Sequence, residues 1–273
     1  MSIVAMSPTI GSLGDDIGRE AARNLGYEFA DREIIEKAAA RFGEGVMEFA
    51  HVTEEKPTLW ERFIDPKRRY MTYVEAIVLE LAARDNVVLA GRGSAFLLGK
   101  MRHVLRVRVI APERVRAVRI EQQDGLVPDA AADLVRQSDN ELAARVRYLY
   151  HVDWTDPFLY DLVLNTERMT AHEGAALIKE ALHNPRFQST GETLGQIRDL
   201  SLTTQCRAAL LAVPTTRPLE LYPTASGGQV IVSGMVERDE QRQMAEEIIG
   251  GVPGVTSVTN NIVVVTRRMA PTL

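Results

Sequence analysis

The chain has 273 residues, a single cysteine and a net charge of −5, with 45% apolar and 25% charged residues. This is the composition of a globular protein long enough for one large domain or two smaller ones. It excludes a disulfide framework and a cysteine-based metal cluster, and the charge balance does not support general nucleic-acid binding. We find no secretory signal at the start and no apolar run long enough to cross a bilayer, so we expect a cytoplasmic protein without a transmembrane segment.

The first 183 residues alternate short apolar runs with helical stretches, which predicts a parallel α/β sheet covered by helices on both faces. The predicted strands are residues 3–6, 86–90, 104–110 and 160–165. The predicted helices lie near residues 15–25, 31–42, 70–84, 112–123, 129–150 and 171–183.

A glycine-rich loop joins the first predicted strand to the first predicted helix, and residues 11–18 read Gly-Ser-Leu-Gly-Asp-Asp-Ile-Gly. Loops of this type bind phosphate through backbone N–H groups and the positive end of the next helix, with a lysine reaching the terminal phosphates. Residues 7–18 contain no Lys or Arg, and they include Asp15 and Asp16. Either another segment supplies the positive charge, or the loop transfers no phosphoryl group. A plain strand-to-helix turn with two first-turn acids is the alternative reading.

Positive charge is concentrated further along the chain. Residues 102–119 contain six arginines and one acid, Glu113. Arg116 and Arg119 are three residues apart, so they share a helix face and could reach one phosphate together. Arg92 stands between two glycines after a buried strand, where open α/β sheets bind ligands, although a structural ion pair is also possible there.

The charged segment at 129–150 is either a solvated helix or a lid that closes over a ligand. Arg145 and Arg147 point to different sides of this helix, so both cannot face one site. The five histidines show no metal-ligand spacing, and no metal ligand is assigned, although Asp16 could hold Mg²⁺ through water.

The α/β pattern ends near residue 185, and the polar stretch 186–196 is the expected linker. An α-β-β-α-β unit is expected over residues 197–268, which is enough for a small α+β domain. Its predicted elements are a helix at 197–212, strands at 219–222 and 229–233 around a turn at 226–228, a helix at 237–249 and a strand at 257–265.

The first domain, residues 1–185, resembles the cytidylate kinase-like branch of the P-loop nucleoside monophosphate kinases. The matching landmarks occur in order: the lysine-free loop, Gly26-Tyr27 followed by residues 31–35, Gly91-Arg92-Gly93, Ala111-Pro112 leading to Arg116 and Arg119, and residues 153–166. The second domain is similar to a BON domain, through residues 228–236 and 252–262.

The first resemblance implies transfer of the γ-phosphoryl group of ATP to a pyrimidine nucleoside monophosphate, CMP or dCMP, with Mg²⁺. The implied catalytic residues are Arg116, Arg119 and Asp139. The implied nucleotide- or phosphate-binding residues are Gly11, Ser12, Gly14, Asp15, Asp16, Asp31, Arg32, Arg92 and Asp161. Asp31 and Arg32 could equally be cap and surface residues of a helix. The insertion at residues 44–69, with Trp60 and Phe63, is where this fold elaborates its monophosphate-binding region.

Three positions depart from the family pattern: Leu13 replaces a loop glycine, Asp15 replaces a loop arginine, and Leu142 replaces a lid arginine. Three hypotheses therefore stand. The chain is an active nucleoside monophosphate kinase, or a catalytically impaired nucleotide sensor whose BON-like domain carries the output. In the third hypothesis, the BON-like domain carries the main function by binding a lipid, a small ligand or a protein.

Overall fold

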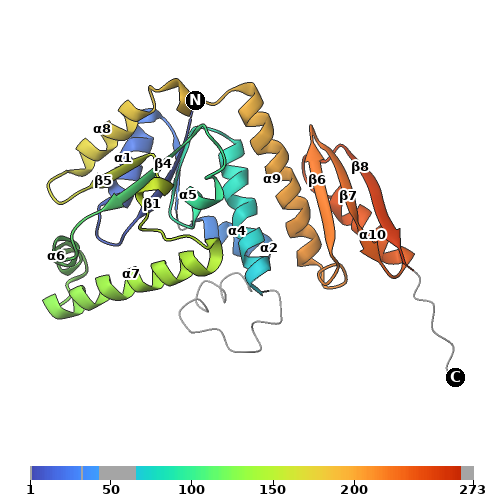
Figure 1. The fold of residues 1–273 in the computed structure, drawn as a ribbon, viewed down its shortest axis with the longest axis horizontal. Coiled ribbons are helices and arrows are strands. Elements are labelled where there is room, and N and C mark those ends of the chain that lie inside the picture. The colour runs from blue at the N-terminus through green and yellow to red at the C-terminus, as the bar shows by residue number, and fades with distance from the viewer. Residues whose placement is uncertain (1, 32, 43–65, 266–273) are drawn as a thin grey trace.

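The computed structural model describes residues 2–31, 33–42 and 66–265. Its first part contains a five-stranded parallel sheet of order β2-β3-β1-β4-β5 (Figure 1). The strands are β1 Ile3–Pro8, β2 Glu28–Ala30, β3 Val87–Ala90, β4 Val104–Ile110 and β5 Leu162–Asn165. The four predicted strands are confirmed. The sequence reading missed β2, because a three-residue strand that begins with an exposed glutamate gives almost no apolar signal.

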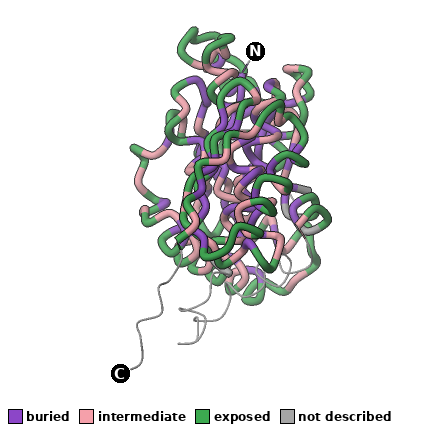
Figure 2. Tube along the Cα trace, turned by 90° about the vertical axis from the view of Figure 1, so that its right-hand side faces the viewer, coloured by how far each residue is buried: buried purple, intermediate pink, exposed green. Residues whose placement is uncertain are grey.

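Helices cover both faces of this sheet. They are α1 Gly14–Leu25, α2 Glu33–Phe42, α4 Pro66–Ala83, α5 Ser94–Leu97, α6 Glu113–Asp124, α7 Pro128–Tyr150 and α8 Ala171–Ala181. Successive residues of the central strand point to opposite faces, so Ile3 packs in the core with α4, while Val4 packs in the core with α1 and α8. Figure 2 shows buried segments, drawn in purple, gathered towards the interior of the chain trace.

The second part is a three-stranded sheet of order β6-β7-β8, with β6 antiparallel and β8 parallel to β7. Its elements are α9 Gly191–Ala212, β6 Leu221–Ser226, β7 Gln229–Val236, α10 Asp239–Gly250 and β8 Ser257–Val264. The predicted α-β-β-α-β order is confirmed. Among the described residues, the structure contains no helix that is both long and apolar enough to span a membrane.

Helix α9 begins six residues before the predicted position, inside the stretch predicted as a linker. The composition was misleading, because residues 186–196 are polar and contain glycines. Thr190 caps the helix: its side-chain oxygen accepts a hydrogen bond from the Thr193 backbone N–H, 3.2 Å away.

Helix α9 packs against both parts of the molecule (Figure 1). Its residues Ile197, Ala208 and Leu211 belong to the core that contains α4 and β1. Leu202, Cys206 and Leu210 on the same helix belong to the core of the small sheet, where burial raises the pKa of the Cys206 thiol to about 11. Polar contacts add to this packing, since Arg41 of α2 donates to the Gln205 side chain of α9 over 3.1 Å.

Candidate functional site

The glycine-rich loop leaves the carboxyl end of β1 and leads directly into α1. Gly11 and Leu13 both have left-handed backbone conformations, with φ of 70° and 62°. The left-handed conformation costs a leucine about 1 kcal/mol of conformational free energy, whereas glycine adopts it freely. The half-buried Leu13 side chain packs against the core beneath α1 and α8, so its apolar contacts offset part of that cost.

Two glycines of the loop are required by contacts within the chain itself. A Cβ atom on Gly14 would lie 2.2 Å from the Pro8 Cβ, and one on Gly11 would lie 2.9 Å from the Arg116 carbonyl oxygen. Ser12 closes the turn by donating its hydroxyl to the Thr9 carbonyl oxygen over 2.6 Å. The loop is therefore packed tightly against β1 and α6.

A cavity of about 630 Å³ lies over the loop, between the start of α1 and helix α6. Its walls are residues 8–16, with Asp31, Arg119, Ile120, Gln123 and Asp124. Among the described residues of this lining are four aspartates, Asp15, Asp16, Asp31 and Asp124, and one cation, Arg119. The cavity is thus large enough for a nucleotide phosphate tail, but its described lining is acidic.

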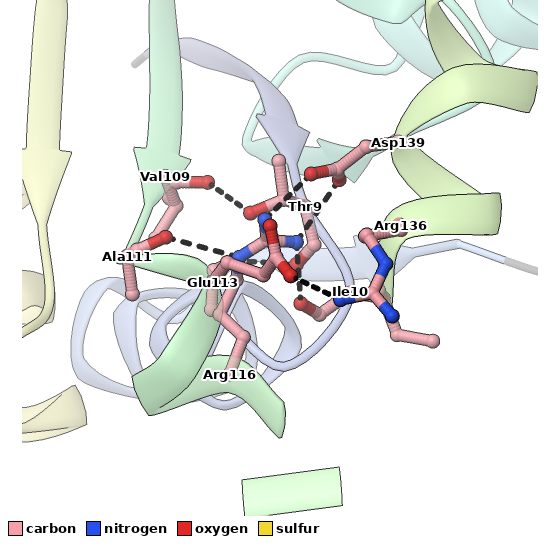
Figure 3. Close-up of polar contacts among 9 residues, drawn as sticks. Thr9, Ile10, Val109, Ala111, Glu113, Arg116, Arg136 and Asp139 are labelled. Carbon is pink, nitrogen blue, oxygen red and sulfur yellow. Dashed lines mark hydrogen bonds and ion pairs between the residues drawn. The ribbon is translucent and has the colours of Figure 1, made fainter. Parts of the chain in front are cut away.

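Arg116 braces the loop from α6 (Figure 3). Its side chain is buried, and its Nε atom donates to the Ala111 carbonyl oxygen, while Nη1 donates to that of Ile10. Both Nη atoms also bind the Asp139 carboxylate of α7, at 2.9 and 2.6 Å. A second ion pair, between Glu113 and Arg136 at 2.9 Å, joins the same two helices. Arg116 therefore ties α7 to the loop, with its donors already engaged.

Arg119 lies three residues after Arg116 on α6 and also contacts the loop. Its Nη1 atom donates to the Gly11 carbonyl oxygen over 3.1 Å, and Nη2 donates to the Thr166 carbonyl oxygen over 2.6 Å. The Thr166 hydroxyl in turn donates to the Ser12 carbonyl oxygen over 2.9 Å. Burial lowers the pKa of Arg119, which is the one cation among the described residues lining the cavity. Arg116 and Arg119 do share a helix face, and that face meets the carbonyl groups of the loop.

Two other arginines, Arg92 and Arg145, have a buried Nε atom with no hydrogen-bond partner among the described residues. Arg92 lies in a run of three left-handed residues, 91–93, at the carboxyl end of β3, and Arg145 lies on α7. Burial raises the pKa of the Tyr70 hydroxyl on α4, and the positive charges of Arg145 and Arg92 oppose that rise. The two guanidinium groups thus come from different elements and lie near the same tyrosine.

Sequence reasoning considered Arg145 but assigned it no role. The helical period of α7 is the signal that could have identified Arg145. The buried residues Val135, Val146 and Leu149 mark the inner side of this helix. Arg145 is half-buried next to that side, whereas Arg147 is exposed. This agrees with the expectation that the two arginines point to different sides of the helix.

Asp161 is engaged within the protein. The Nε, Nη2 and backbone N–H groups of Arg106 all donate to its carboxylate, at 3.0, 2.9 and 2.9 Å. Asp31 is half-buried in the wall of the loop cavity.

Three other residues named from the sequence, Arg32, Trp60 and Phe63, lie outside the described residues. The roles assigned to all these site residues remain predictions.

Replacing Asp161 with asparagine tests its pairing through the pH dependence of stability. Burial opposes ionisation of this carboxyl group, but the Arg106 hydrogen bonds outweigh it, and the pKa of Asp161 is lowered. A lowered carboxyl pKa stabilises the fold above the unfolded pKa of about 3.9, and this contribution is lost as the pH falls through the folded-state pKa. In urea unfolding at pH 7 we expect Asp161→Asn to lose about 1–3 kcal/mol, and the difference from the wild type to shrink towards pH 3. The exposed Glu240→Gln serves as control, and a pH-independent difference for Asp161→Asn would contradict the pairing.

The fold and the loop define a class of protein. A central β1 strand that leads through a glycine-rich loop into a helix, within a parallel sheet of this order, is the arrangement of the P-loop kinases. The sequence profile of the cytidylate kinase-like family matches residues 3–168, and the chain belongs to this family. The profile of the BON domain matches residues 198–266.

Curated relatives of the first part carry the same family name. The cytidylate kinase of Methanopyrus kandleri is 29% identical over 195 residues, which cover 67% of this chain and 95% of the relative. That of Pyrobaculum calidifontis is 29% identical over 174 residues, covering 63% of this chain and 88% of the relative. Among solved structures, an uncharacterized protein from Eubacterium ventriosum shares the fold with a TM-score of 0.54 at 12% identity, covering 67% of this chain and 99% of its own.

Proposed function

We propose that residues 3–168 form an ATP-dependent nucleoside monophosphate kinase that accepts CMP or dCMP. The observation that carries this proposal is the pair of guanidinium groups, Arg92 and Arg145, with buried Nε atoms that lack partners among the described residues. Burying an unpaired polar group is costly, so an anion is the expected partner. The family and its cytidylate kinase relatives support a nucleoside monophosphate as that anion.

In this proposal the two arginines hold the acceptor phosphate, and the loop cavity receives the phosphates of ATP. The backbone N–H groups at the start of α1 favour an anion there. Arg116 and Asp139 keep α7, which carries Arg145, fixed relative to the loop. Arg119 borders the loop cavity, which supports a role in stabilising charge on the transferred group.

Mg²⁺ would be held in part by the nucleotide. Among the described residues, no group of three or more His, Cys, Asp or Glu side chains is arranged to hold a metal ion. Mg²⁺ commonly uses one or two carboxylates together with substrate phosphates, and Asp16 in the cavity wall fits that donor set. When bound, the ion would neutralise negative charge on the phosphates.

A second function is favoured by one specific observation, the acidic lining of the loop cavity. In the described part of the lining, four carboxylates accompany one guanidinium, and this balance would weaken the stabilisation of a transferred phosphoryl group. A nucleotide sensor could tolerate this, because it needs binding without turnover. In that reading the BON domain would carry the output, through the shared helix α9.

A coupled assay with ATP, Mg²⁺ and each nucleoside monophosphate tests the two functions, alongside an Asp15→Arg variant. We expect slow turnover with CMP or dCMP in the wild type, and a gain in kcat/KM of roughly tenfold to a hundredfold in the variant, because one preorganised group at the transferred charge changes rates by about that much or more. Glu240→Arg makes the same charge change at an exposed residue of α10 in the BON domain, so it is expected to leave turnover unaltered.

The alternatives give different results in the same experiment. Nucleotide-dependent thermal stabilisation without turnover in the wild type and the variant would replace the kinase with the sensor. Neither turnover nor stabilisation by any nucleotide would reject both functions.

A further inference from the structure

Thr166 is a buried residue at which β4, the glycine-rich loop and α6 meet. It directly follows β5, and its backbone N–H donates to the Ile110 carbonyl oxygen of β4 over 2.8 Å. Its hydroxyl accepts a hydrogen bond from Arg119 of α6 over 3.0 Å. The hydroxyl has one proton, and the nearer of its two acceptors is the Ser12 carbonyl oxygen of the loop, at 2.9 Å against 3.3 Å for Ile110. A single side chain therefore links the loop to α6.

The contacts of Thr166 decide which N–H groups of Arg119 remain for a ligand. A guanidinium group has five N–H donors in one plane. The two on Nη1 go to the Thr166 hydroxyl and the Gly11 carbonyl oxygen, and one on Nη2 goes to the Thr166 carbonyl oxygen. The Nε donor and the second Nη2 donor have no partner among the described residues. Nε and Nη2 are neighbours on one edge of the guanidinium, and such an edge can bind a phosphate with two parallel hydrogen bonds.

The start of α1 offers further donors to the same cavity. Leu13 occupies the N-cap position of this helix and makes no side-chain cap hydrogen bond. The N–H groups of the first turn therefore receive no cap from Leu13, and residues 14–16 of this turn line the cavity together with Arg119. The Ser12 carbonyl group belongs to the peptide unit that leads into Leu13. Its hydrogen bond to Thr166 thus fixes the orientation of the chain where the helix begins.

We propose that Thr166 is a positioning residue for the phosphates of the donor nucleotide. This inference rests on the proposed function, in which ATP occupies the loop cavity. The Thr166 hydroxyl holds the two groups that would contact these phosphates, the Nε–Nη2 edge of Arg119 and the start of α1, in a fixed relation to each other. With a methyl group in its place, one Nη1 donor and the Ser12 carbonyl oxygen would face an apolar atom. Both would turn towards other partners, and the fixed relation would be lost.

Calorimetric titration of the full chain with a non-hydrolysable ATP analogue and Mg²⁺ tests this role. We expect Thr166→Val to lower the affinity for the analogue about tenfold, the effect of losing one hydrogen bond to a charged group, and to leave the affinity for CMP unaltered. Thr166→Ser keeps the hydroxyl and is expected to bind the analogue like the wild type. In an Arg119→Met background the valine substitution should cause a smaller loss, because one of the groups through which Thr166 acts is then absent.

Thr216→Val is the matched control. Thr216 is also buried, and its hydroxyl donates to the Leu210 carbonyl oxygen over 2.7 Å, within the second part of the molecule. We expect Thr216→Val to lower the thermal stability of the ligand-free protein, as Thr166→Val does, without changing the affinity for the ATP analogue. If Thr166→Val fails to fold, Thr166→Ala removes the same hydroxyl without placing a new atom beside Arg119 and is expected to lower the same affinity.

Three outcomes would overturn the positioning role alone. They are wild-type affinity for the ATP analogue in folded Thr166→Val, an equal loss in Thr166→Val and Thr166→Ser, and an equal loss of affinity for CMP and for the analogue. A wild type that binds neither CMP nor the ATP analogue would reject the proposed function together with this role. The two failures are therefore distinguishable, and none of these measurements depends on turnover.

Discussion

Arg116→Met is expected to be the most destabilising of the substitutions considered for the first domain, lowering the free energy of unfolding by about 2–4 kcal/mol. The variant leaves the Asp139 carboxylate without its two Nη donors, and the Ile10 and Ala111 carbonyl groups without theirs. Breaking a buried ion pair from one side costs about 3–5 kcal/mol, and the lower range applies here because the Asp139 side chain is 32% exposed. Urea unfolding at neutral pH measures the loss.

Arg114→Met is the matched control on the same helix. Its ion pair with Glu167 involves an Arg114 side chain that is 80% exposed, so we expect a loss of less than about 1 kcal/mol. The double variant Arg116→Met, Asp139→Leu should lose less than the sum of its single variants, because no carboxylate is then left unpaired. Equal losses for Arg114→Met and Arg116→Met would contradict the bracing role.

Removing either Arg92 or Arg145 is expected to separate ligand binding from stability. With methionine at either position, we expect the affinity for CMP or dCMP to fall by roughly tenfold to a hundredfold, the size of a lost charge-assisted hydrogen bond of about 1.5–3 kcal/mol. The ligand-free protein should lose no stability, because the substitution removes a buried donor that has no partner among the described residues. Titration calorimetry and thermal unfolding of the ligand-free protein provide the two readouts, and neither depends on turnover.

Arg147→Met on the same helix is the control, since that side chain is exposed and is expected to change neither quantity. A fall in the stability of the ligand-free protein, with unchanged affinity, would show that Arg92 and Arg145 are structural.

The elements predicted best from the sequence are those in which local pattern and tertiary environment agree. The strand at 104–110 was predicted with the observed bounds, because its apolar residues are consecutive and the strand lies within a sheet covered on both faces. The start of α9 was predicted six residues too late. Glycines and polar residues before residue 197 favoured a linker, although Thr190 is a residue type that caps helices. The short strand β2 depends on pairing with β3, which has no local signature.

For the site, the sequence could indicate which residues share a face but not what that face meets. Arg116 and Arg119 do share one, yet they contact carbonyl groups of the loop, because α6 packs directly beside Gly11. Similarly, Arg106 of β4 pairs with Asp161, which directly precedes β5 and lies 55 positions away in the chain. Such contacts follow from topology, which residue spacing alone does not specify.

Helix α9 also limits how this chain can be divided. A fragment that ends at the polar stretch before residue 191 would leave α4 without Ile197, Ala208 and Leu211 against it. A fragment that begins there would carry those three apolar side chains exposed to water. Either piece would bear a surface prone to aggregation. Recombination could therefore not exchange the BON domain for a different domain at this junction unless it also kept, or rebuilt, the inner side of this helix.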